Sequence, residues 1–276
     1  MKLGGYSLIK NESQWIGPHL MAWLPSLGQI VLADGNSTDG TLETIRLIRD
    51  RHPFGQKITL IENCDPKDLQ DDYVRVQNLC LRSLKTEFAT FLHPDFFPIS
   101  GAETLDEKLG DGLAYTHGMK SYAGEPGESY VYEILDGRAK RWKNIMRLRN
   151  PDLGLHYFGH YGAHNEDMYF KEITGDHHEF LGTNFQHYPF KVEDSGLAIA
   201  HFSDVRAHER RLGRMVSCLV NQGHSKEEAV RRAPDHPRVN FDSRDGFVFN
   251  KTEYPEAYTK AVAEFENFKK GALSNV

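Results

Sequence analysis

Cysteine is scarce in this chain. Only three stand among the 276 residues, at positions 64, 80 and 218, and no two form a C-x-x-C pair. An odd number without paired spacing provides neither a disulfide framework nor a zinc site, and it is typical of a reducing compartment. Long apolar runs are missing too: no stretch approaches the ~18 uninterrupted apolar residues of a membrane span, and the opening MKLGGYSLIKNES holds no signal-peptide core. We therefore expect a cytoplasmic protein that meets a membrane, if at all, by docking at its surface.

Positive charge is also in short supply. The 33 lysines and arginines are outnumbered by 39 aspartates and glutamates, which gives a formal charge of -6 and argues against a strongly basic nucleic-acid-binding protein. Basic residues gather locally at 138–149 and 206–214. We interpret both runs as solvated faces of secondary structure; the alternative is a surface for an anionic acceptor. P-loop and G-x-G-x-x-G phosphate-binding motifs are absent.

What is present is an alternation of short apolar runs and amphipathic segments. With 39% hydrophobic and 26% charged residues, the composition is that of an ordinary globular protein, long enough for one large domain or a domain with an appendage. Strand-helix alternation in the N-terminal part predicts an α/β fold with a mainly parallel sheet flanked by helices. The predicted strands cover 6–10, 29–33, 57–62 and 88–92, and the predicted helices lie within 13–27, 37–52 and 71–85.

The second half has a different pattern. Residues 110–200 are rich in glycine, tyrosine and histidine with short strand-like runs, which indicates a mixed region with long loops. From position 203 the pattern turns helical, with a capping box in SKEE at 225–228 and a last helix that starts at Pro255. We therefore predict a main domain at 1–202 and a helical C-terminal appendage at 203–276 packed on it.

Polar residues follow each of the four predicted strands. The carboxyl ends of parallel strands gather at one edge of a sheet, and ligands of such folds bind beyond that edge. We therefore expect the ligand site there. The four ends read Lys10-Asn11-Glu12, Asp34-Gly35-Asn36, Glu62-Asn63 and His93-Pro94-Asp95.

The stretch LADGNSTDGT, after the second predicted strand, has an unusual density of small oxygen-bearing side chains. A calcium loop is excluded, because its sixth position holds Asp39 in place of glycine and its twelfth holds Ile45 in place of glutamate. A strand-to-helix turn, with Ser37 or Thr38 as the helix cap, explains most of the run. Such a turn does not require the carboxylate of Asp34, which we expect to accept a nucleobase N–H or a ribose hydroxyl.

Three segments, in this order, resemble the opening of inverting glycosyltransferases of family 2, which have the GT-A fold. They are SLIKNES, QIVLADGNSTDGTLETI and YVRVQNLCLRSLKTEFATFLHPDFFPIS, and they fall within residues 5–100. The resemblance implies transfer of a sugar from a nucleotide-sugar donor to an acceptor hydroxyl, with inversion. It also implies a divalent metal, Mn²⁺ or Mg²⁺, and a main domain that binds both donor and acceptor.

Carried over residue by residue, the resemblance implies a donor site at the strand ends. Asp34 would hold the nucleobase, and Asp95 would be the last aspartate of an Asp-x-Asp metal motif. His93 stands where the first aspartate would be, and imidazole tolerates Mn²⁺ better than Mg²⁺. His201 resembles the late metal-binding histidine of many GT-A enzymes; the alternative is a half-buried histidine at a strand end. The expected nucleotide-sugar-binding residues are Asn11, Glu12, Asp34, Asn36, Arg75, Asn78 and His93, and the expected metal ligands are Asp95 and His201.

The reaction also needs a base that takes the proton from the acceptor hydroxyl, and a carboxylate suits that task. Glu166 and Asp167 resemble the acidic pair in the second half of the family's sequences. Adjacent side chains of a strand point to opposite faces, so only one of the two would face the site, and we favour Asp167 as the base. The alternative for both is a solvated acidic loop.

Two other functions stay open. A nucleotidyltransferase on a related sheet would need a glycine-rich basic loop after the first strand, which IKNESQWIG does not provide. A non-catalytic nucleotide-sugar-binding module is favoured by His93, which departs from the metal motif. The acceptor stays open among a glycan, a lipid-linked saccharide and DNA that carries a hydroxymethylated base.

Overall fold

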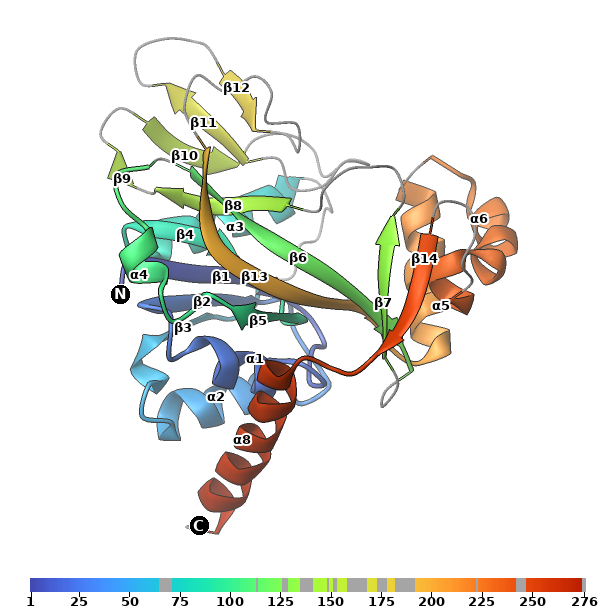
Figure 1. Ribbon diagram of the computed structural model, residues 1–276, viewed down its shortest axis with the longest axis horizontal. Helices are drawn as coiled ribbons and strands as arrows, with labels where there is room; N and C mark the ends of the chain where they lie inside the picture. The colour runs from blue at the N-terminus through green and yellow to red at the C-terminus, as the bar shows by residue number, and fades with distance from the viewer. Residues whose placement is uncertain are drawn as a thin grey trace.

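In the part of the chain that it describes, the computed structural model has two sheets, with helices packed around the larger one (Figure 1). The larger sheet has ten strands and the smaller has four. The structure describes residues 1–64, 71–112, 114–125, 129–134, 141–147, 149–150, 153–157, 168–172, 178–181, 192–221, 223–241 and 247–274.

The N-terminal part alternates strands and helices in the order that the sequence predicts, with shifts of a few residues at the ends. A short 3-10 helix, η1, is an addition to that order. The bounds are β1 (Leu3–Ile9), α1 (Ile16–Trp23), β2 (Gln29–Asp34), α2 (Thr41–Arg51), η1 (Gly55–Lys57), β3 (Ile58–Ile61), α3 (Asp71–Ser83) and β4 (Phe88–Phe91).

These four strands are parallel and lie side by side in the order β3-β2-β1-β4. Ile9 at the end of β1 is level with Asp34 at the end of β2, so both strands end at the same edge. Apolar side chains cover both faces of the sheet: Leu3 packs in one cluster with residues of α1 and α2, and Tyr6 packs in another with residues of α3. Burial on both faces is typical of parallel strands. The predicted class, a mainly parallel sheet flanked by helices, is confirmed.

Strands from later in the chain extend this sheet beyond β4, as Figure 1 shows. They begin with β5 (Phe96–Ser100), which is followed by α4 (Leu105–Lys108). The other strands of the extension are β6 (Ala114–Gly124), β7 (Ser129–Ile134), β8 (Arg141–Arg147), β13 (Val192–Val205) and β14 (Phe247–Thr252). The long strand β13 pairs parallel with β6 and antiparallel with β5, so it brings residues near position 200 next to the turn after β4. The smaller, antiparallel sheet is made of β9 (Arg149–Asn150), β10 (Leu153–Tyr157), β11 (Met168–Glu172) and β12 (His178–Leu181).

The C-terminal segment is helical, as predicted, apart from β14. Ser225 Oγ accepts a hydrogen bond from the N–H of Glu228, which confirms the first half of the predicted capping box. Strand β14 pairs with β7, and the predicted boundary at 202–203 falls inside β13, so this segment joins the larger sheet at both places. Its helices are α5 (His208–Asn221), α6 (Lys226–Arg232), η3 (Ala233–Asp235), α7 (Pro237–Asn240) and α8 (Glu256–Leu273).

Helix α8 packs against α1 in the core (Figure 1). The ring of Phe265 lies over Gly17, where an added Cβ would stand only 2.4 Å from the ring Cζ. Glycine at this position therefore permits the close approach of the two helices.

Pro18 lies in the first turn of α1, where its missing N–H has no partner within the helix, so the helix continues past it. One prediction about a helix end is wrong. Helix α2 starts at Thr41 with Gly40 (φ 90°) as its N-cap, and not with a Ser37 or Thr38 cap. The hydroxyls of those two residues contact other groups, described next.

Candidate functional site

An asparagine in the left-handed conformation stands two residues after the end of β1, of β2 and of β3. They are Asn11 (φ 57°), Asn36 (φ 59°) and Asn63 (φ 59°). Asparagine adopts this region more readily than most residues with a side chain. The three strands therefore end in similar sharp turns at the edge where the sequence predicts the site.

The loops after β1 and β2 are joined by hydrogen bonds between their side chains and backbones. Asn11 Oδ1 accepts from the N–H of Thr38 at 2.8 Å, and the N–H of Asn11 donates to Ser37 Oγ at 2.9 Å. The N–H of Glu12 donates to Thr41 Oγ1 at 2.8 Å, and Asp39 accepts from the N–H of Ser13 at 3.1 Å. The oxygen-rich stretch LADGNSTDGT thus holds the first strand's loop in place, and this fixes the backbone of Glu12.

Asp34 has a structural role that the sequence analysis did not assign to it. Asp34 is only 1% exposed. Its Oδ1 accepts a hydrogen bond from the hydroxyl of Ser37 at 2.6 Å, and its Oδ2 accepts one from the N–H of Ser37 at 3.1 Å. The turn therefore does use this carboxylate. Each carboxylate oxygen has a second lone pair, so the predicted contact with a nucleobase stays a prediction. Asn36, the other residue predicted here, is exposed.

Helix α3 brings Arg75 and Asn78 to the region of β1 and β2, against which it packs. Arg75 is exposed and Asn78 is buried. Burial raises the pKa of the Cys64 thiol, the positive charge of Arg75 opposes that rise, and the negative charge of Asp34 adds to it. Arg75, Asp34 and Cys64 are therefore neighbours, as the predicted nucleotide site requires of the first two.

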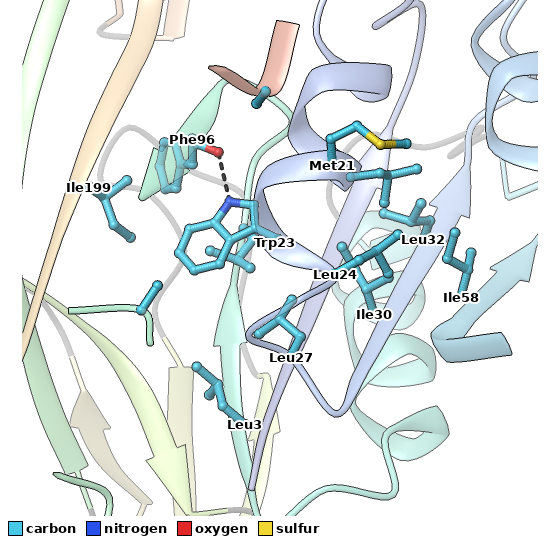
Figure 2. Packing of buried hydrophobic residues seen from close by; sticks show 14 of the residues in the cluster. Leu3, Met21, Trp23, Leu24, Leu27, Ile30, Leu32, Ile58, Phe96 and Ile199 are labelled. Atoms are coloured by element: carbon cyan, nitrogen blue, oxygen red, sulfur yellow. Dashed lines mark hydrogen bonds between the residues drawn. The ribbon is translucent and has the colours of Figure 1, made fainter. Parts of the chain in front are cut away.

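The turn at 93–96 is held from two sides. His19 Nδ1 and Trp23 Nε1, both on α1, lie 3.0 and 2.9 Å from the carbonyl oxygen of Phe96, and Figure 2 shows the contact of Trp23. The N–H of Phe202 on β13 donates to the carbonyl oxygen of Asp95 at 2.9 Å. Burial lowers the pKa of His19 to about 4. His19 is therefore neutral at pH 7, and its Nδ1 carries the proton if it donates to Phe96. Buried donors thus fix the backbone beside Asp95.

Asp95 and His201 meet because β13 pairs with β5, with His201 opposite Phe96. Asp95 Oδ1 lies 3.9 Å from His201 Nε2, and Oδ2 lies 3.4 Å from Arg206 Nη2. Burial would raise the pKa of Asp95, but the nearby His201, His93, Arg214 and Arg206 outweigh it and hold the pKa down at about 2. The carboxylate is therefore ionised at neutral pH.

Glu12 is the second acid of this cluster. Its Oε2 lies 3.8 Å from the same Arg206 Nη2 that approaches Asp95. Burial raises the pKa of Glu12 to about 7; Arg206 lowers it and Asp95 raises it further. The structure therefore brings Glu12, His93, Asp95 and His201 together, and their predicted ligand contacts stay predictions. It also adds two arginines that were not expected in the site from the sequence.

The first of these, Arg206, stands just beyond the end of β13 with a side chain 13% exposed. The second, Arg214 on α5, is close enough to lower the pKa of both acids. Arg211 lies behind Arg206: its Nη1 donates to the carbonyl oxygens of Arg206 and Gly124, and Nη2 pairs with Glu125 at 2.7 Å. The basic run 206–214, interpreted as a solvated face, thus includes Arg206 in the site, the exposed Arg214 near enough to affect both acids, and the buried Arg211, which holds the backbone.

A divalent cation fits this site only with oxygens from a ligand. In its favour, Asp95 Oδ1 and Glu12 Oε2 are buried and have no hydrogen-bond partner among the described residues, and Oδ1 faces His201 Nε2. Carboxylate oxygen and imidazole nitrogen together suit Mn²⁺. However, within the described ranges no three His, Cys, Asp or Glu side chains are arranged to hold a metal ion. Phosphate oxygens of a donor would have to complete the coordination.

The predicted base cannot be placed in this geometry. Glu166 and Asp167 lie outside the described residues, and so do parts of the basic run 138–149. In the part of the chain that the structure describes, no helix is both long and apolar enough to cross a membrane.

Comparison with protein-family models finds no match to this sequence, and comparison with curated proteins finds none either. Solved structures do match. TarS from S. aureus is 14% identical, with 97% of this chain and 81% of that chain covered and a TM-score of 0.39. The mannosyltransferase PcManGT from Pyrobaculum calidifontis, in complex with GDP-Man and Mn²⁺, is 11% identical, with 99% and 83% covered and a TM-score of 0.45. A Bacillus anthracis protein described as a glucose-1-phosphate thymidylyltransferase is 12% identical, with 53% and 65% covered and a TM-score of 0.31. The fold of this chain is given by its own strand order and register, a parallel β3-β2-β1-β4 core with helices on both faces.

Proposed function

We propose that this chain is a glycosyltransferase that moves a sugar from a nucleotide-sugar donor to an acceptor hydroxyl with inversion. The observation that carries the proposal is the convergence of Glu12, Asp95, His201 and Arg206 at the carboxyl edge of the parallel sheet. Charges of both signs, largely buried at the edge where such sheets bind ligands, suit a substrate that carries phosphate charge and a counter-ion.

The nucleoside would lie against the wall made by the loops after β1 and β2. This wall is preorganised by the hydrogen bonds of Asn11 with Ser37 and Thr38. Asp34 would accept from the base, and Asn36, Arg75 and Asn78 would line the same part of the site. Preorganised binding groups cost little to order when a ligand arrives.

The departing nucleoside diphosphate needs its charge neutralised. Arg206 and Arg214 provide two fixed positive charges on the side of Asp95 and Glu12. Asp95 and His201 would hold the divalent cation, and a cation bound there stabilises negative charge on the leaving group. His93, which stands in place of the first motif aspartate, lies close enough to affect the pKa of both acids and adds no negative charge to compete for the phosphates.

The acceptor hydroxyl would attack the anomeric carbon from the face opposite the diphosphate. A new carbon–oxygen bond forms as the bond to the diphosphate oxygen breaks, and the hydroxyl proton passes to a carboxylate. We assign that role to Asp167, with Glu166 as the alternative. The acceptor is a glycan, a lipid-linked saccharide or modified DNA.

A panel of nucleotide sugars with and without Mn²⁺ tests the proposal. We expect slow hydrolysis of at least one donor and an increase in melting temperature with UDP or GDP that grows when Mn²⁺ is added. Asp95→Asn, which keeps the side-chain volume, should remove the Mn²⁺-dependent part. Absence of both nucleotide binding and donor hydrolysis would contradict the proposal. Release of pyrophosphate from a nucleoside triphosphate would identify a nucleotidyltransferase, and binding without turnover would identify a non-catalytic module.

A further inference from the structure

One guanidinium nitrogen holds both acids of the site. Arg206 Nη2 lies 3.4 Å from Asp95 Oδ2 and 3.8 Å from Glu12 Oε2. Both distances exceed the ~2.7–2.9 Å of a strong charge-assisted hydrogen bond. Asp95 Oδ1 and Glu12 Oε2 are also buried, and no residue that the structure describes forms a hydrogen bond with either atom. The two carboxylates are thus compensated in charge by Arg206 and incompletely satisfied in hydrogen bonding, which is an arrangement that a better ligand can displace.

Among the described carboxylates and guanidinium groups of this site, charge is balanced before any ligand enters. Glu12 and Asp95 contribute two negative charges when ionised, and Arg206 and Arg214 contribute two positive charges that act on both acids. A free divalent cation therefore meets a carboxylate whose charge is already neutralised. A nucleoside diphosphate and a divalent cation that enter together bring charges of opposite sign and preserve the balance.

The position of Arg206 allows its side chain to change partners without movement of the backbone. Arg211 Nη1 donates to the carbonyl oxygens of Arg206 and Gly124, and the guanidinium of Arg211 stacks 4.5 Å from the ring centre of Phe241. Arg211 is only 4% exposed. The backbone of Arg206 is thereby fixed, and its guanidinium reaches the two carboxylates within a mostly buried site.

We propose that Arg206 holds Asp95 and Glu12 in the donor-free protein and moves to the diphosphate of the donor when the donor binds, which frees Asp95 for the divalent cation. This proposal rests on the proposed function. Guanidinium binds phosphate in a bidentate geometry, which the separated carboxylate oxygens here do not provide. The consequence is that Mn²⁺ and nucleoside diphosphate bind cooperatively. The diphosphate removes Arg206, which competes with Mn²⁺ for Asp95, and bound Mn²⁺ is a further partner for the phosphate oxygens.

Mn²⁺ binding to the free protein, followed by the EPR signal of unbound Mn²⁺, tests this directly. We expect weak binding of Mn²⁺ alone to the unaltered protein, and binding about ten-fold tighter or more in the presence of UDP or GDP. Arg206→Gln should change the affinities for the two ligands in opposite directions. Mn²⁺ alone should bind several-fold tighter because a competing positive charge is lost. Nucleoside diphosphate alone, measured by calorimetry, should bind more weakly. The ten-fold coupling should largely disappear.

Two further variants make the result specific to Arg206. Arg206→Lys keeps the positive charge but loses the bidentate donor geometry of the guanidinium, so it should give intermediate coupling. It also provides a second test if the Gln variant does not fold. Arg210→Gln removes an exposed charge one helical turn before Arg214 and should leave the coupling unchanged. Circular dichroism and melting temperature confirm that each variant is folded.

Two outcomes overturn the proposal and differ in what else they overturn. If the unaltered protein binds UDP or GDP but Arg206→Gln weakens Mn²⁺ binding or leaves it unchanged, Arg206 is not a competitor for Asp95, and the proposed function stands. If the unaltered protein binds neither nucleotide with or without Mn²⁺ and hydrolyses no donor, the proposed function and this inference fail together.

Discussion

Asn11 Oδ1 accepts a hydrogen bond from the backbone N–H of Thr38 at 2.8 Å, across the gap between the ends of two neighbouring strands. The same asparagine has φ 57°, so its backbone and its side chain both serve the turn. Its neighbour Glu12 is held through its N–H by Thr41 Oγ1. The position of an acid in the candidate site therefore depends on contacts between two loops that are remote from the acid's own carboxylate.

Replacement of Asn11 should expose this dependence. Asn11→Ala loses the amide acceptor and also places alanine in the left-handed region, with a total cost of about 2–3 kcal/mol in the free energy of unfolding. Asn11→Gly avoids the backbone cost and loses only the acceptor. Urea unfolding measures both, and a thermal-shift titration with UDP or GDP measures the consequence for the site.

Asn36 provides the matched control. It has φ 59°, and within the described residues its side chain has no hydrogen bond. Asn36→Ala should therefore cost only the backbone part, about 1 kcal/mol. If Asn11→Ala and Asn36→Ala have equal effects on stability, the contact between the loops does not stabilise the fold.

Glu12 should make the stability of the protein depend on pH. The pKa of about 7 in the folded protein lies above the ordinary value of 4.5 because burial disfavours the charged form. The folded state then binds the proton more tightly than the unfolded state, so stability is fully present below pH 4.5 and declines as pH rises toward 7. A shift of this size corresponds to about 3 kcal/mol at most. Glu12→Gln removes the ionisation, so it should be more stable than the unaltered protein at pH 8 and equal to it near pH 4.

Melting temperatures at pH 5 and pH 8 measure the difference, with the exposed Glu43→Gln as a control that should not change it. A Glu12→Gln variant with the same pH dependence as the unaltered protein would show that Glu12 is ionised in the folded state without cost.

The sequence is sufficient to predict the edge of the sheet but not the charge balance at it. Apolar runs of strand length between amphipathic segments specify a parallel sheet, and polar residues after each run then fall at one edge. Asp95 and Glu12 could be named on that basis, and His201 could be named only from the family resemblance. Arg206 could not, because its contact with Asp95 joins residues 111 positions apart and depends on β13 lying between β5 and β6.

Asp34 shows the opposite error. From the sequence alone, a turn at this position does not require the carboxylate, yet Ser37 donates to it from both its hydroxyl and its N–H. Aspartate side chains often accept from the backbone a few residues on, so the signal was available in the spacing of Asp34 and Ser37. The pattern alone does not tell whether such a carboxylate also binds a ligand.

Two substitutions separate the structural and the ligand-binding roles of Asp34. Ser37→Ala removes the hydroxyl donor and leaves the carboxylate intact, so it should cost about 1 kcal/mol of stability and leave nucleotide affinity within about two-fold. Asp34→Asn keeps an acceptor for the N–H of Ser37 and loses the charge, so it should weaken UDP or GDP binding by about ten-fold or more. Calorimetric titration of each variant measures the affinities. Equal nucleotide affinities for the two variants would restrict Asp34 to the turn.

Glu166 and Asp167 are adjacent, so one pair of variants can distinguish the base from its neighbour. Asp167→Asn removes the proton acceptor, and general-base catalysis is worth about 10²–10⁴-fold in rate, so donor turnover should fall by that factor while nucleotide affinity stays the same. Glu166→Gln should retain most of the turnover. Donor hydrolysis under Mn²⁺ and calorimetric titration of UDP or GDP provide the two readouts. A larger loss for Glu166→Gln would assign the base to Glu166 instead. Equal, small losses for both would exclude the pair and leave Glu12, whose pKa of about 7 suits a base at neutral pH, as the carboxylate to replace next.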